Sequence, residues 1–458
     1  MNNDSHPITP TLDAERLRRY AEHLAFYGGD QWPASLRRQN RRLVFNYAKA
    51  IVDKTASYVL GGLNFGVDPV DDTPEAAARA RETERTLARM YEENQLDQLD
   101  FDNEVDASIL GDGAYKVTWD ATERRVRITA PDVQGLFAWW CGDDVSRVWR
   151  VASRYALDAE AAQSLHGVTP RAPHAGARTG ARIRAGGPKT GVEIVEVWTG
   201  AAFELWADGA RIEQRDNPYG FIPFVIYPNL REPKKFWGVS DLPAIKEPLR
   251  ELNRALTQLS MILELSGNPI AVLENVTEST DIAVMPGAVW EIPERARAYL
   301  LDLLQGGGVK LHADYVDIIY RALHDLGEAP RTAFGDNRSG LSGVALNVEL
   351  DPLLKKVQRK RLIRAAEFRP RNEMALRILE RYGEAPAGTA ASYAPYRSRI
   401  IWGSVLPLDR SRLVSDERAL VASGIHSRRR AADELGVEDP EGEFRRWLEE
   451  QREVVAGG

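Results

Sequence analysis

Apolar side chains recur at three- and four-residue steps in two stretches of the chain, and this spacing places them on one face of a helix. The first row begins at Leu311 and ends before Gly327, which predicts a helix over 309–326. The second stretch, 351–382, carries ten Lys and Arg against three Glu, and as one helix it would span about 48 Å, at about 1.5 Å per residue. We expect a kink near Ala366–Pro370, because proline removes a helix hydrogen bond and its ring clashes with the preceding turn.

A loop that contains several glycines is predicted between these two helices, over 328–350. Gly335, Gly340 and Gly343 impose little backbone restriction, so we expect this loop to move.

The rest of the chain alternates between helical and strand patterns. Helical spacing predicts further helices at 12–26, 34–60, 73–94, 96–110 and 248–266. Runs of β-branched and aromatic residues between turn residues predict strands at 114–119, 125–130, 136–140, 148–155, 192–198, 202–206, 211–214 and 221–227. The pair at 114–119 and 125–130 is expected to form a hairpin.

Three further segments have a distinct character. Residues 161–190, rich in Ala, Gly, Pro and Arg, are predicted to form a long mobile surface loop. Residues 268–305 are predicted to form a compact β insert with strands at 270–273, 283–285 and 288–292, carried between the helices 248–266 and 309–326. After a linker at 383–392, short helices are expected with caps at Ser415, Ser427 and Asp439–Pro440.

Composition is that of a soluble globular protein, with 43% hydrophobic and 28% charged residues in 458 positions. A chain of this length holds about two to four domains. The single Cys141 excludes an intrachain disulfide and a cysteine-based zinc site, and fits a reducing compartment. The N-terminus lacks the apolar core of a signal peptide, and no stretch approaches the ~18 apolar residues of a membrane span. We therefore expect no membrane contact.

The net charge of −7 argues against tight binding of nucleic acid, because proteins that grip phosphates are usually basic. The charge fits a protein that meets DNA without holding it. An ordinary acidic cytoplasmic protein is the alternative that the charge alone leaves open.

The motifs that would indicate catalysis are missing. Gly306–Lys310 lacks the spacing and the hydroxyl of a phosphate-binding loop, and in Gly340–Gly343 the second glycine comes one residue early for a nucleophile elbow. The seven histidines are scattered. We predict no catalytic residues, no cofactor and no metal site, which favours a structural protein.

Two motifs close together resemble the portal proteins of long-tailed bacteriophages. They are NPYGFIPF at Asn217–Phe224 and FWGVSDL at Phe236–Leu242. Four other stretches resemble the family in the same order, at 46–62, 249–265, 339–346, and 423–427 with 435–440. Together they extend over most of residues 40–450.

The resemblance implies an α+β portal fold in which about twelve subunits form a ring around a central channel at one capsid vertex. The implied parts are a wing at 1–240, stem helices at 241–266 and 309–328, a clip at 267–308, a tunnel loop at 329–350, a long kinked wing helix at 351–383 and a crown at 384–458. Such a ring conducts double-stranded DNA during packaging and ejection. Its partners would be the terminase large subunit, a head-completion or adaptor protein, and capsid and scaffold proteins. The implied location is the virion, after assembly in the host cytoplasm.

Candidate site residues follow from placing the two helices and their loop in a channel wall. Polar positions that would line the wall are Lys310, Asp314, Asp317, Arg321 and Asp325. Loop positions that would approach DNA are Arg331, Phe334, Asn337, Arg338, Ser339 and Leu341. The basic helix is expected to be a rib packed between subunits rather than a DNA grip. The alternatives are a nucleic-acid-processing accessory enzyme, which would need ATPase or nuclease activity, and a non-viral helical scaffold or adaptor, which predicts no ring.

Overall fold

The structure is a computed structural model of the 458-residue chain. It describes residues 7–8, 12–32, 42–168, 191–267, 270–274, 297–301, 308–336, 343–383, 392–405, 410–437 and 440–456. The chain divides into two compact units, Met1–Ile401 and Trp402–Gly458. The described residues form both helices and antiparallel sheets, which confirms the α+β class.

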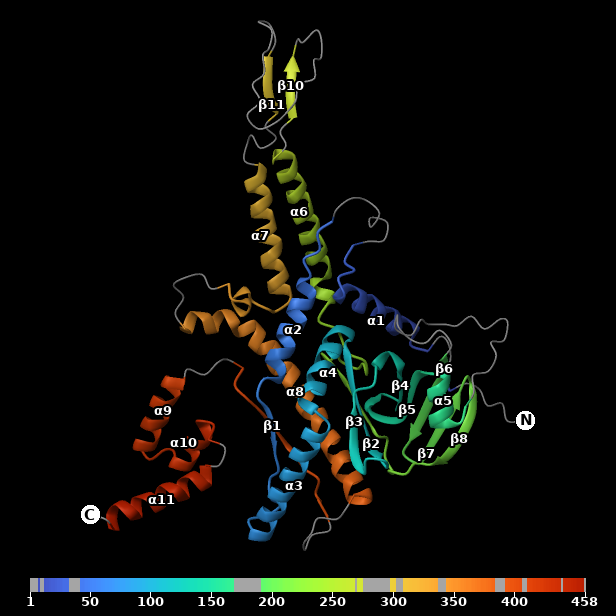
Figure 1. Cartoon of the computed structure of the whole chain (residues 1–458), viewed down its shortest axis with the longest axis vertical. Helices are drawn as coiled ribbons and strands as arrows, with labels where there is room; N and C mark the ends of the chain where they lie inside the picture. The colour runs from blue at the N-terminus through green and yellow to red at the C-terminus, as the bar shows by residue number, and fades with distance from the viewer. Residues whose placement is uncertain are drawn as a thin grey trace. The chain divides into compact units, whose positions relative to one another are not determined.

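Four helices open the first unit (Figure 1). They are α1 (Ala14–Tyr27), α2 (Tyr47–Leu60), α3 (Pro74–Glu93) and α4 (Leu96–Leu110). The prediction of a helix from residue 34 was wrong for residues 42–46, which are not helical, and residues 33–41 lie outside the described part. The reason is local: the Asn46 side chain accepts a hydrogen bond from Lys49 N and begins α2, while Phe45 N donates to the Asn253 side chain instead of to a helix carbonyl.

Two antiparallel sheets follow. The first has the order β3-β2-β9, with β2 (Asp112–Asp120), β3 (Arg125–Thr129) and β9 (Phe224–Pro228). The second has the order β4-β5-β6-β7-β8, with β4 (Leu136–Cys141), β5 (Asp144–Asp158), β6 (Gly191–Thr199), β7 (Ala202–Ala207) and β8 (Ala210–Asp216). A short 3-10 turn, η2 (Val133–Gly135), precedes β4. The hairpin of β2 and β3 is confirmed. The other predicted strands of these two sheets are confirmed too, except that residues 221–223 of the strand predicted at 221–227 precede β9 and are not part of it.

Strand β6 separates two apolar clusters, because successive side chains of a strand point to opposite faces. Val192 and Ile194 belong to the main core with α1, α2 and α6, whereas Val195 and Val197 pack in a smaller cluster with Phe137. The sheet is therefore covered on both faces.

The predicted loop at 161–190 begins inside a helix. Helix α5 (Ala159–His166) is capped by the Asp158 side chain, which accepts a hydrogen bond from Ala161 N at 2.7 Å, and Ala162 is fully buried. Residues 169–190 lie outside the described part of the chain.

Helices α6 (Pro243–Gly267) and α7 (Gly308–Leu326) form a pair (Figure 1). The prediction for α7 is confirmed, but α6 begins at Pro243 and not at Pro248, which lies inside the helix near its start. Between α6 and α7 in the chain, β10 (Ile270–Glu274) pairs with β11 (Arg297–Leu301) in antiparallel fashion. The strand at 270–273 was predicted and β11 was not, while the strands predicted at 283–285 and 288–292 lie outside the described residues.

The predicted loop after α7 is shorter than expected. It contains the 3-10 turn η3 (Arg331–Phe334), and α8 (Gly343–Tyr382) already begins at Gly343, so residues 343–350 are helical. Helix α8 continues through both Pro352 and Pro370, and the kink near Pro370 stays a prediction. Strand β12 (Arg399–Trp402) pairs with β1 (Leu63–Gly66).

The second unit contains α9 (Arg410–Ala422), α10 (Arg428–Glu434) and α11 (Pro440–Ala456). Ser427 caps α10 as predicted, accepting a hydrogen bond from Arg430 N at 3.2 Å. The cap predicted at Ser415 was wrong, because this residue lies inside α9. Helix α11 begins at Pro440, and Asp439 lies outside the described residues.

Candidate functional site

Helices α6 and α7 each bury one face within the chain. Leu249, Leu252 and Ala255 of α6 are buried, as are Ile319 and Leu323 of α7, and all five belong to the main core. The other faces of α7 carry the polar wall candidates and a row of exposed apolar residues.

The five wall candidates form one polar row on α7. Their steps of three and four residues keep them on one face, and the members are Lys310, Asp314, Asp317, Arg321 and Asp325. All are exposed except the half-buried Asp317. Asp317 forms an ion pair with Arg321 and a second with Arg331 of η3, at 3.0 Å.

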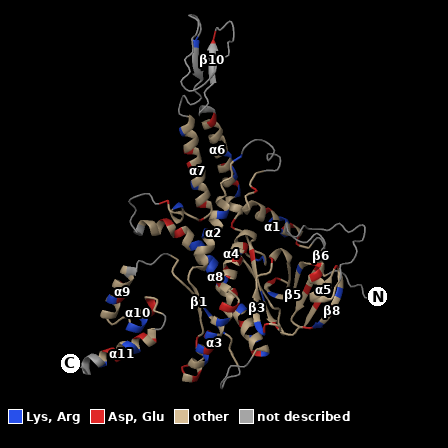
Figure 2. Cartoon of the chain, in the orientation of Figure 1, with Lys and Arg blue, Asp and Glu red and all other residues tan. Residues whose placement is uncertain are grey.

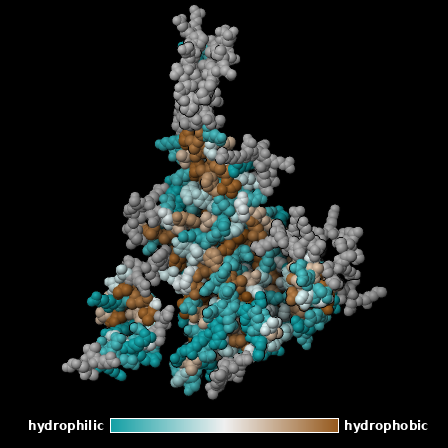
Figure 3. Space-filling model, viewed as in Figure 1, coloured by the Kyte–Doolittle hydropathy of each residue, from teal (hydrophilic) through white to brown (hydrophobic). Residues whose placement is uncertain are grey.

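A second row on α7 is apolar and exposed. It consists of Leu311, Tyr315, Ile318 and Leu326, each one residue after a member of the polar row and so about 100° further round the helix. Leu311 is 72% exposed, Ile318 64% and Leu326 53%. Figure 3 shows hydrophobic residues gathered over the α6–α7 pair. Within this chain nothing among the described residues covers the row.

The loop candidates divide into two groups. Arg331 and Phe334 are half-buried in η3: Arg331 pairs with Asp317 and, at 3.4 Å, with Asp336, and the Phe334 ring lies 5.3 Å from the His324 ring. The others, Asn337, Arg338, Ser339 and Leu341, lie outside the described residues. The role of all six residues in the channel stays a prediction.

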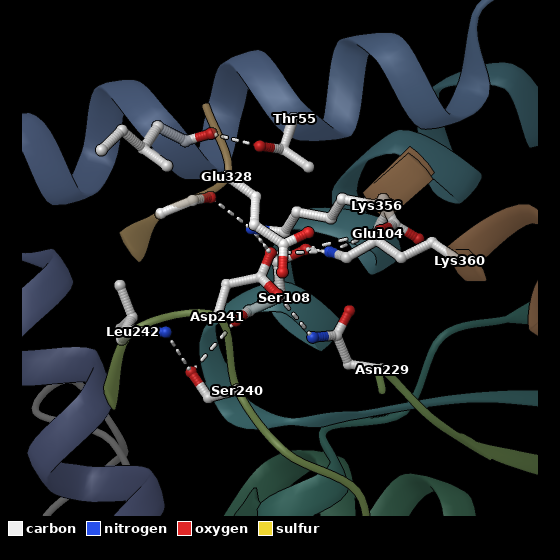
Figure 4. Close-up of polar contacts among 12 residues, drawn as sticks. Thr55, Glu104, Ser108, Asn229, Ser240, Asp241, Leu242, Glu328, Lys356 and Lys360 are labelled. Carbon is white, nitrogen blue, oxygen red and sulfur yellow. Dashed lines mark hydrogen bonds and ion pairs between the residues drawn. The ribbon is translucent and has the colours of Figure 1, made fainter. Parts of the chain in front are cut away.

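Figure 2 shows Lys and Arg positions along α8. Several of these cations are buried, and none of them is among the predicted site residues. Lys360 is fully buried in a polar cluster (Figure 4). Its ammonium lies 2.7 Å from Asp241 Oδ2 and 3.4 Å from Glu104 Oε1, and donates a hydrogen bond to Ser108 Oγ at 2.7 Å. A buried charge is tolerated only when it is paired in this way.

Lys356, one turn earlier, connects the cluster to the helix pair. Its ammonium lies 3.5 Å from Asp241 Oδ2 and donates to the carbonyl of Gly327 at 3.0 Å. Asp241 precedes the first residue of α6 by two positions, and Gly327 directly follows α7. Burial acts to raise the pKa of Asp241, but Lys356 and Lys360 outweigh it and hold that pKa well below its usual range. The start of α6 and the end of α7 are thus both tied to α8.

Arg364 and Arg371 continue this buried row. Arg364 binds both carboxylate oxygens of Glu104, at 2.6 and 3.0 Å. Arg371 lies 2.5 Å from Asp100 Oδ1, and its guanidinium carbon lies 4.5 Å from the centroid of the Tyr115 ring. Because these cations are buried in ion pairs of their own chain, they are unavailable to DNA or to a neighbouring subunit. The expectation that the basic helix is a rib packed between subunits rather than a DNA grip stays a prediction, but these buried cations take no part in such a contact.

The spacing of the buried cations could have revealed them. Lys356, Lys360, Arg364 and Arg371 share one helix face with Leu353, which is also buried. Basic residues on the apolar side of a helix indicate buried ion pairs, although the spacing does not identify the carboxylates.

Within the described ranges, no group of three or more His, Cys, Asp or Glu is arranged to hold a metal ion. Among the described helices, none has the length and apolar character needed to cross a membrane.

Comparison with known proteins supports the resemblance found in the sequence. A family model described as phage portal protein, SPP1 Gp6-like, matches residues 11–169 and 185–456. A search of the curated proteins finds no match to the chain. The family match covers nearly the whole chain, including both stem candidates and the buried cluster. The chain belongs to this phage portal family, whose members are structural proteins of the bacteriophage virion that serve genome packaging and connect head to tail.

Proposed function

We propose that this chain is one subunit of a closed ring of about twelve copies at a single capsid vertex. The ring conducts double-stranded DNA during packaging and ejection. It docks the terminase large subunit during packaging and a head-completion or adaptor protein afterwards. The wing, stem, clip, tunnel-loop and crown ranges given above, and assembly in the host cytoplasm with capsid and scaffold proteins, are part of this proposal.

The observation that carries the proposal is the exposed apolar row on α7. Fully burying one Leu or Ile side chain contributes about 1.5–3 kcal/mol, so leaving Leu311, Ile318 and Leu326 in water forgoes several kcal/mol per subunit. A second copy packed against this row recovers that energy. Because each copy would offer the same row and a different complementary face, the contact is heterologous and closes into a ring.

The polar row supports passage of DNA without retention. It lies about 100° from the apolar row, so a ring that covers the apolar row turns the polar row toward the axis. Each subunit contributes two cations, Lys310 and Arg321, and three carboxylates from the same row. Tight binding would require clustered cations that displace counterions from phosphates, and a wall with this mixture keeps DNA mobile.

Mass measurement of the purified full-length chain tests the proposal. The expected result is a closed ring of about a dozen subunits, with a central hole in axial electron-microscope views. A protein that stays monomeric at every concentration and salt tested would refute it. ATPase or nuclease activity in a monomer would favour the accessory-enzyme alternative instead.

A further inference from the structure

A polar recess of about 330 Å³ opens where the end of α7, η3 and the first turns of α8 meet. A water molecule takes about 30 Å³ of liquid volume, so the recess has room for a long side chain. The buried lysine cluster does not line it, but the channel candidates Arg321, Asp325 and Arg331 do.

Two buried polar atoms of residues that line the recess lack hydrogen-bond partners in the described part of the chain. His324 is only 2% exposed, and its Nδ1 lies 2.5 Å from the carbonyl oxygen of Ala329. A carbonyl only accepts, so Nδ1 carries the proton and donates. Burial lowers the pKa of His324, which keeps the ring neutral and leaves Nε2 as an acceptor. Nε2 and Thr332 Oγ1 are both buried without a partner among the described residues, although buried polar atoms are normally hydrogen-bonded.

The charges around the recess leave an excess of carboxylate. Arg331 pairs with Asp317 and Asp336, and Arg321 pairs with the same Asp317. Two cations are therefore balanced by two carboxylates. The other two acids that line the recess, Asp325 and Glu349, are exposed and have no ion-pair partner in the described ranges.

His324 Nε2 is a buried hydrogen-bond acceptor, and the carboxylates of Asp325 and Glu349 have no cation beside them among the described residues. A positively charged group that only donates hydrogen bonds would satisfy both. Lysine ammonium and arginine guanidinium are the two side-chain groups with that character. A metal ion is a poorer fit, since the described residues contain no suitable group of three ligands.

We propose that the recess receives a Lys or Arg side chain from a second copy of this chain. This inference rests on the proposed ring. The position of the recess favours a second copy, because Asp325 is followed directly by Leu326 of the exposed apolar row, and Ile318 lies one turn before Arg321. A neighbour that covers the apolar row comes alongside the mouth of the recess. The described residues leave the place of this cation empty, and the neighbour would supply it.

The test compares two double variants of the full chain that remove the same charge. Asp325→Asn with Glu349→Gln neutralises the recess. Asp314→Asn with Asp351→Asn removes two exposed carboxylates that do not line the recess, one on α7 and one on α8. All four positions are exposed, so both variants should fold as the wild type does by circular dichroism. Sedimentation velocity then gives the protein concentration at half assembly over a range of NaCl concentrations.

We expect the recess variant to need about tenfold more protein for half assembly, which is the effect of a loss of about 1.4 kcal/mol, and to depend less on salt. The matched control should stay within about threefold of the wild type, equivalent to less than 1 kcal/mol. Equal behaviour of the two variants would overturn the inference while leaving the ring intact. A wild-type chain that forms no ring would overturn the proposed function, and with it a second copy as the occupant. Two results together would also overturn the inference: calorimetry that shows free spermidine binding to the recess, and assembly that is unchanged in the recess variant. The occupant would then be a free cation and not a side chain of a second copy.

Discussion

Replacing Lys360 with methionine should destabilise the first unit strongly. Methionine is similar in length and leaves no large cavity, so the change isolates the lost charge. Among the described residues, it leaves Asp241 with one cation, Lys356 at 3.5 Å, and a hydrogen bond from Asn229 at 3.1 Å. It also takes from Ser108 Oγ the hydrogen bond that this atom accepts at 2.7 Å. Removing one partner of a buried ion pair typically costs about 3–5 kcal/mol. Lys356 still compensates part of the Asp241 charge, so we expect the lower end, about 3 kcal/mol.

Urea unfolding followed by tryptophan fluorescence measures this loss, and the chain contains 11 Trp. Urea is preferable to guanidinium because it leaves the ionic strength unchanged. Subunit association adds to apparent stability, so both proteins should be compared at a concentration where mass measurement finds only monomer. The free energy follows from the midpoint and the slope of the transition.

A matched control replaces a cation in an exposed pair. Arg250→Met removes the pair with Glu247 at 2.6 Å, in which both side chains are exposed, and should cost about 0.2–1 kcal/mol at most. A double-mutant cycle of Lys360→Met with Asp241→Asn should give a coupling energy of about 1–3 kcal/mol. The reasoning would be refuted if Lys360→Met lowered the free energy of unfolding by less than ~1 kcal/mol, or if the cycle gave no coupling energy. In either case the cluster would not hold α8 to the start of α6.

Three further outcomes are expected. Leu311→Ser with Ile318→Ser should leave a folded monomer that no longer assembles, measured by sedimentation, whereas Leu165→Ser, at a comparably exposed position on α5, should assemble normally. Burial raises the pKa of Glu367 from 4.5 to about 6, so the folded state holds this proton more tightly and stability is lost as pH rises through that range. Glu367→Gln should remove that loss, making the chain about 2 kcal/mol more stable at pH 7 but not below pH 4, as urea unfolding across pH would measure. Phe334→Ala should still form rings but retain packaged DNA poorly; failure to assemble would show that the turn is an interface.

The sequence predicted those elements whose ends are marked by local chemistry. Helix α7 ends where its apolar row meets Gly327, and α10 begins where the Ser427 side chain can cap it. The prediction failed where distant residues decide the local structure. Residues 42–45 are not helical because side chains of α6 bind their backbone, as Asn253 binds Phe45 N at 2.8 Å.

The buried cluster could be predicted only in part. Helical spacing places Lys356, Lys360 and Arg364 on one face, but no local pattern indicates that their carboxylates lie in α4 and before α6. The arrangement of the candidate wall residues could also be predicted only in part. Their common face on α7 follows from the sequence, while the half-burial of Asp317 depends on the position of Arg331 in η3.

The pairing of Glu104 with Lys360 also bears on how the chain is made. The two residues are 256 positions apart. At about 5–20 residues per second, Glu104 leaves the site of synthesis tens of seconds before its buried counter-ions exist. During that interval α4 carries a carboxylate that cannot be buried unpaired, so the N-terminal region remains open to water and to proteases. Synthesis of α8 then supplies the cations with which Glu104 can be buried.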